Sequence, residues 1–103
     1  MREEQANTIP LFLLKQTVWT IRGYYFFKEF VGNPDNRDLL ALTRYPEYLQ
    51  IIDEEKEKIP EEYRTEVWNH VLYNCKFPNR NLNSYFEQKD KFITGVSARL
   101  HSR

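Results

Sequence analysis

The residues best suited to chemistry in this sequence are the bases and amides near its C-terminal end. Residues 76–103 carry six Lys or Arg and two Asp or Glu, a net charge of +4, with Asn, Ser and Gln among them. Arg bonds bidentately to guanine and Asn or Gln to adenine, and a helix N-terminus after a basic loop can meet a phosphate. We therefore predict that this segment binds DNA. The candidate residues are Arg80, Lys89, Lys91 and Arg99 for phosphates, Asn81, Asn83, Ser84 and Gln88 for base edges, and Lys76 in the same basic unit.

The segment before it has the opposite charge. Residues 47–66 carry eight acids and three bases, a net charge of −5, and residues 67–75 carry none. The zero net charge of the whole chain, with 15 bases and 15 acids, is therefore a cancellation between segments. In one interpretation the acidic helix pairs with the C-terminal bases, and in the other it binds a partner protein. The candidates for partner binding are Asp53, Glu54, Glu55 and Glu57, with Tyr24 and Tyr45 as aromatic anchors.

Aromatic residues are abundant for a chain of this size. Seven Phe, seven Tyr and two Trp in 103 residues exceed what a small core needs. They indicate either a bulky aromatic core or an interface, because exposed Tyr and Trp are typical interface anchors. Under the second interpretation, a homodimer through the N-terminal helix is also possible.

The sequence offers little for catalysis. Its two His and one Cys lack the spacing of metal ligands, and it contains neither a Gly-rich phosphate loop nor a nucleophile motif. We expect no metal, no cofactor and no enzymatic activity. As a minor alternative, Arg64 and His70 resemble the loose motif of HEPN-type ribonucleases. That resemblance implies that the Arg stabilises charge on a phosphate and the His helps in proton transfer.

Composition also bears on the setting of the protein. No apolar run approaches 18 residues and the N-terminus lacks an apolar signal segment, so we expect no membrane partner. The lone Cys75 cannot form an internal disulfide, and we expect it to be a small buried residue. A cytoplasmic location follows from these expectations.

The elements that position these residues are predicted to be helices of one domain, residues 1–103. In residues 10–31, apolar side chains follow steps of three and four, which is typical of a helical face, and Phe12, Trp19 and Phe26 form a second stripe. We expect this helix to be mostly buried, because it is apolar over a wide arc. Strand-forming residues at 17–27 leave a hairpin open as the alternative.

Prolines and caps divide the rest of the chain. We expect a short helix over 37–45 that Pro46 ends, a second over 46–58 whose acidic half 53–58 is solvated, and a third over 60–74. The last helix is predicted to start at Asn83 or Ser84 and reach Leu100, with Ser84 and Glu87 forming a capping box. The prediction is an all-α bundle of four to five helices, in which residues 60–100 form a C-terminal helix-turn-helix-like pair.

One stretch of the chain resembles a known family. Ile59-Pro60-Glu61-Glu62-Tyr63-Arg64, then Val67-Trp68-Asn69 and Tyr73, then Phe77-Pro78, Tyr85, Lys91-Phe92-Ile93, Val96 and Leu100 resemble small regulators of Gram-positive phages and mobile elements. These proteins are similar to the ArpU-like late transcription regulators. The resemblance implies a helix-turn-helix related to region 4 of sigma factors, with the helix 84–100 in the DNA major groove. The alternative is a phage accessory protein that binds a host protein, such as RNA polymerase or a defence enzyme.

Overall fold

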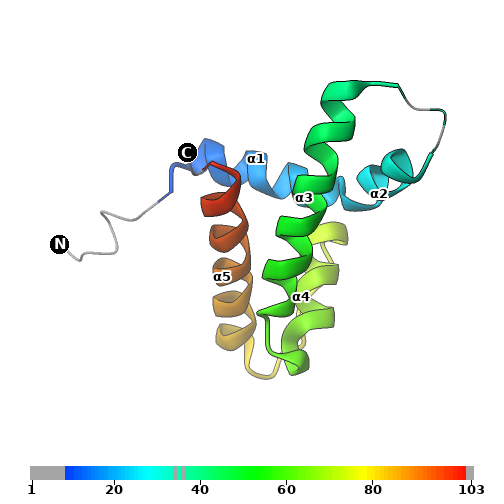
Figure 1. The fold of residues 1–103 in the computed structure, drawn as a ribbon. Coiled ribbons are helices and arrows are strands. Elements are labelled where there is room, and N and C mark those ends of the chain that lie inside the picture. The colour runs from blue at the N-terminus through cyan, green and yellow to red at the C-terminus, as the bar shows by residue number, and fades with distance from the viewer. Residues whose placement is uncertain (1–8, 34, 36, 102–103) are drawn as a thin grey trace.

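The chain folds into helices. The computed structural model describes residues 9–33, 35 and 37–101, and within these ranges there are five helices and no strand (Figure 1). The helices are α1 (Leu11–Arg22), α2 (Tyr24–Gly32), α3 (Leu39–Glu57), α4 (Glu61–Tyr73) and α5 (Leu82–Leu100). The all-α bundle that the sequence predicts is confirmed.

Helices α3, α4 and α5 lie side by side, and α1 lies across one end of this unit (Figure 1). Helices α4 and α5 run in the same direction, so the segment 74–81 must lead back along α4 before α5 begins. Helix α5 packs against α1, α3 and α4. None of the helices in the described ranges has both the length and the apolar character that crossing a membrane requires.

The N-terminal segment is helical, so the hairpin alternative is wrong, but it forms two helices rather than one. Gly23 caps the C-terminal end of α1 and has φ −83° and ψ 4°. The ring of Phe27 lies so close to Gly23 that an added Cβ would come within 2.8 Å of its Cζ. A residue without a side chain therefore allows α2 to begin directly against the end of α1.

The second apolar stripe of this segment is exposed, in contrast to the prediction. Phe12, Trp19 and Phe26 are 63%, 79% and 58% exposed. Only the opposite side of the segment reaches the core, where Ile21 and Tyr24 are buried. The helical period places the stripe correctly, but α1 lies at the outside of the bundle and packs on one side only.

Helix α3 continues through Pro46, so the predicted break there is wrong. Proline lacks the N–H that would bond the Leu42 carbonyl and normally ends or kinks a helix. Here aromatic packing holds the turns on both sides of it. The ring of Phe27 lies 4.4 Å from that of Tyr45 and 5.6 Å from that of Tyr48, so α2 packs against α3 both before and after the proline.

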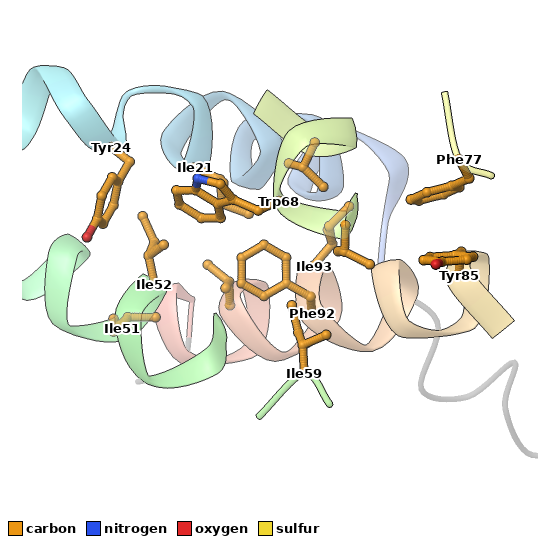
Figure 2. Packing of buried hydrophobic residues seen from close by; sticks show 13 residues of the cluster. Ile21, Tyr24, Ile51, Ile52, Ile59, Trp68, Phe77, Tyr85, Phe92 and Ile93 are labelled. Carbon is orange, nitrogen blue, oxygen red and sulfur yellow. The ribbon is translucent and has the colours of Figure 1, made fainter. Parts of the chain in front are cut away.

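One apolar core joins the helices. It contains Trp68 of α4 and Phe92 of α5 together with Ile21 of α1 and Ile52 of α3, which Figure 2 labels. The indole of Trp68 packs edge-on against Tyr24 at 5.1 Å, and the ring of Phe92 lies 6.2 Å away. The indole N–H donates to the Tyr25 hydroxyl at 3.2 Å, which satisfies its one polar atom.

Candidate nucleic-acid interface

The segment 74–81, which we call the α4–α5 connection, begins and ends with a left-handed asparagine. Asn74 at the end of α4 has φ 60°, and Asn81 at the start of α5 has φ 55°. Asparagine tolerates this conformation better than most residues. Helix α5 starts at Leu82, directly after the left-handed Asn81. The capping box predicted between Ser84 and Glu87 does not form. Ser84 lies inside the first turn, and Glu87 pairs with Lys91 at 3.5 Å instead.

Phe77 anchors the connection to the helices. Its ring stacks on the His70 imidazole at 4.1 Å, with an angle of 14° between the planes. It also stacks on the Tyr85 ring at 5.1 Å, as Figure 2 shows. Phe86 packs edge-on against it at 5.1 Å. Phe77 is 8% exposed. A buried ring held by side chains of both α4 and α5 fixes the path of the connection between them.

His70 fixes the same connection by hydrogen bonds. Its Nδ1 lies 2.8 Å from the Cys75 carbonyl, and its Nε2 lies 3.1 Å from Lys89 Nζ. A carbonyl only accepts and an ammonium only donates, so Nδ1 carries the proton and Nε2 accepts from Lys89. Cys75 contributes its backbone to this arrangement while its side chain is exposed, so the expectation of a buried thiol is wrong.

Arg64, the proposed partner of His70 in the ribonuclease alternative, is held elsewhere. Its Nη2 donates to the carbonyls of Glu57 at 3.1 Å and Ile59 at 2.9 Å. It therefore ties the start of α4 to the end of α3. Arg64 thus bonds the end of α3, whereas His70 bonds the α4–α5 connection and α5.

The predicted DNA-binding residues divide into two groups. Lys76, Arg80, Asn81 and Asn83 are exposed, and the described residues show no carboxylate paired with either base. Ser84 and Gln88 are partly buried. Lys89 is held by His70, and Lys91 pairs with Glu87. Arg99 lies at the other end of α5. It is roughly 24 Å from Asn83 along the helix axis, at 1.5 Å per residue.

Near the C-terminal end of α5, ion pairs neutralise part of the acidic charge of α3. Arg99 pairs with Glu54 at 2.7 Å and with Glu55 at 3.3 Å, and Lys58 pairs with Glu55 at 2.8 Å. Glu55 lies under Gly95 and is buried, which corrects the expectation that the acidic half of α3 is wholly solvated. The interpretation in which C-terminal bases pair with the acidic helix thus applies to Arg99 alone among the candidates.

These contacts shift two pKa values. Hydrogen bonds from Gln50 and then from Arg99 hold the pKa of the Glu54 carboxyl below its usual range. The hydrogen bond to Glu54 likewise raises the pKa of the Arg99 guanidinium. A carboxyl whose pKa is lower in the folded chain adds stability above its unfolded pKa, and this stability is lost as the pH falls through the folded pKa.

A pH titration of stability tests this linkage. Arg99→Gln removes one of the two donors to Glu54, so it should lower the stability of the fold at neutral pH. The difference from the wild type should shrink as the pH falls below the usual glutamate range. Urea denaturation from neutral pH into the acid range measures it. Lys76→Gln is the control, since Lys76 has no described ion pair, and its difference should not change with pH. A pH-independent difference for Arg99→Gln would contradict the linkage.

The candidates for partner binding are mostly engaged within the chain. The Tyr24 hydroxyl donates to Asp53 at 2.6 Å, and burial, followed by this bond, raises the pKa of Tyr24. Glu54, Glu55 and Glu57 form ion pairs, and Tyr45 packs among Phe26, Phe27 and Phe30. The predicted helix over residues 10–31 was expected to be mostly buried, but Leu11 and Phe12 on it are exposed. Their spacing alone could not show which stripe faces the solvent.

Known proteins add no assignment to this geometry. Comparison of the chain with protein-family models, curated proteins and solved structures finds no match. In the ranges that the structure describes, no group of three or more His, Cys, Asp or Glu side chains is placed to hold a metal ion. The function is therefore inferred from the arrangement of this chain's own residues.

Proposed function

We propose that this protein binds DNA as a small regulator, and that the α4–α5 connection and the first turn of α5 form the contact surface. One observation carries the proposal. Lys76 and Arg80 are exposed without a described carboxylate partner, on a segment that Phe77 holds in place, next to exposed Asn81 and Asn83. Because the backbone of this segment is already fixed, meeting a phosphate would order only the side chains of these cations and not a loop as well.

The chemistry of these groups fits a division of roles. Lys76 and Arg80 would contact phosphates, which supply much of the affinity for DNA and make it dependent on salt. Asn81 and Asn83 would lie near base edges, where an amide can donate and accept at adenine. The Asn81 side chain makes no cap hydrogen bond, so the first turn of α5 keeps free N–H groups that favour an anion.

The surface proposed here is narrower than a whole recognition helix. Tyr85, Phe92, Ile93 and Val96 of α5 are buried against the other helices. The exposed side of α5 also carries Glu87 and Asp90, which would repel phosphates along its length. The contact is therefore concentrated at the N-terminal end of α5, which is the part of a recognition helix that reads bases in helix-turn-helix proteins.

The test is a pair of double variants with the same change in charge. Lys76→Glu with Arg80→Glu should lower the affinity for a mixed-sequence DNA duplex at low salt by at least about tenfold. It should also reduce the slope of log affinity against log salt by about 2, since each phosphate contact contributes about 0.9. Fluorescence anisotropy of the labelled duplex over a salt series measures both quantities.

The matched control is Lys15→Glu with Arg44→Glu, two exposed bases outside the proposed surface. At about 0.1 M salt it should change DNA affinity by less than about threefold, because at this ionic strength charges more than about 10 Å apart are largely screened. Equal losses in both double variants would show that only net charge matters. No binding by the wild type at low salt would reject the proposal.

A further inference from the structure

A second surface is the groove between α1 and residues 89–98 of α5, and it includes neither Lys76 nor Arg80. Leu11, Leu14 and Val18 line it from α1, and Ile93 and Ala98 from α5. The groove has a volume of about 1380 Å³ and a mainly apolar lining. Pockets for small molecules are typically about 300–1,000 Å³. The size and open shape of this groove suit a peptide segment better.

The rim of the groove carries apolar side chains that no described contact covers. Leu11 is 66% exposed and Trp19 is 79% exposed, and both line the groove. Single exposed apolar residues are ordinary, whereas several beside an apolar groove mark a binding surface. Tryptophan is among the residue types enriched at the energetic centres of interfaces.

The charges around the groove favour one kind of occupant. Lys15, Arg22 and Lys89 line it, together with a single acid, Asp90. None of the three bases forms an ion pair in the described structure: Arg22 donates to the Val71 carbonyl at 2.8 Å and Lys89 to His70. A two-fold dimer would place this basic rim against itself. An acidic partner would neutralise it instead.

We propose that this groove binds an acidic amphipathic helix of another protein. Its apolar side would pack on Leu11, Leu14 and Val18, and its carboxylates would face Lys15, Arg22 and Lys89. Helix-in-groove docking is a common mode of peptide recognition, and apolar residues one turn apart supply its anchors. The helical wall from Leu11 to Arg22 is about 18 Å long, which matches a helix of about 12 residues. This proposal does not depend on DNA binding, because the two surfaces differ.

The experiment uses the full chain and two designed helical peptides of about 16 residues, without Trp or Tyr. One carries Leu at helical spacing on one face and Glu on the other, and its partner has Lys in place of every Glu. The acidic peptide should bind and shift the fluorescence of the exposed Trp19. The Lys peptide should bind at least about tenfold more weakly. Anisotropy of the labelled peptides gives the affinities.

Adjacent residues of α1 supply matched variants. Leu11 and Phe12 are similarly exposed, at 66% and 63%, but only Leu11 lines the groove. Leu11→Ala should weaken binding of the acidic peptide by at least about fivefold. Phe12→Ala should change it by less than about twofold, and circular dichroism should show both variants folded, because neither side chain is in the core.

Several results would overturn the proposal. The proposal is wrong if the acidic peptide does not bind, or if the Lys peptide binds equally well. It is also wrong if Leu11→Ala binds the acidic peptide with the wild-type affinity. A dimer in analytical ultracentrifugation that Leu11→Ala dissociates would assign the groove to a second copy of this chain instead.

Loss of DNA binding in the Lys76 and Arg80 variant, with peptide binding intact, would show that the two surfaces act separately.

Discussion

Replacing Phe77 with alanine is expected to lower the free energy of unfolding by about 3–5 kcal/mol, the usual cost of removing a buried phenylalanine ring. The reason is its position between the His70 and Tyr85 rings, at 4.1 and 5.1 Å, with Phe86 at its edge. Without the ring, the connection loses its only buried side chain, and a cavity opens between α4 and α5. Urea denaturation followed by circular dichroism measures the loss.

The same substitution also tests the proposed DNA surface. If Phe77 holds Lys76 and Arg80 in place, Phe77→Ala should weaken DNA binding even at low temperature, where the variant is still folded. Phe12→Ala is the control, because it removes the same ring from a site that is 63% exposed. It should cost less than about 1 kcal/mol and leave DNA affinity unchanged. A Phe77→Ala variant with wild-type stability would mean that the ring does not anchor the connection.

Replacing Gly95 with leucine is expected to cost about 2 kcal/mol or more, although leucine favours a helix by about 1 kcal/mol over glycine. Glycine at this point lets α5 lie against the buried Glu55 of α3, and an added Cβ would meet the Glu55 carboxylate. That carboxylate is held by Lys58 at 2.8 Å and Arg99 at 3.3 Å, so it cannot move aside without breaking ion pairs. The leucine must either expel a charged group or separate the two helices.

The matched control is Gly32→Leu. Gly32 is the last residue of α2, and a Cβ added there would have no atom within 4 Å. The variant should unfold at nearly the wild-type urea concentration. If Gly95→Leu did the same, the contact between α5 and Glu55 would not limit the packing of the bundle. A loss in both variants would mean that the effect does not arise from the contact with Glu55.

The sequence by itself determined the features that depend only on residues close together along the chain. Helices are predicted over residues 10–31, 60–74 and 84–100, and the structure has helices in all three segments. The charge pattern also follows from the order of residues alone. Lys76 and Arg80 of the proposed DNA surface could therefore be named from the sequence, whereas Lys15, Arg22 and Trp19 of the groove could not. Helix periodicity and charge order are local properties, so a local pattern is enough.

Only the tertiary structure decided which of these residues face the solvent and which are paired. Trp19 and Phe12 have the spacing of core residues, yet α1 packs on one side and leaves them exposed. Glu55 and Arg99 are 44 residues apart and meet because Gly95 lets α3 and α5 approach closely. Pro46 remains inside a helix because α2 packs on both sides of it. Burial and pairing depend on contacts between distant segments, and a local pattern contains no information about which segments meet.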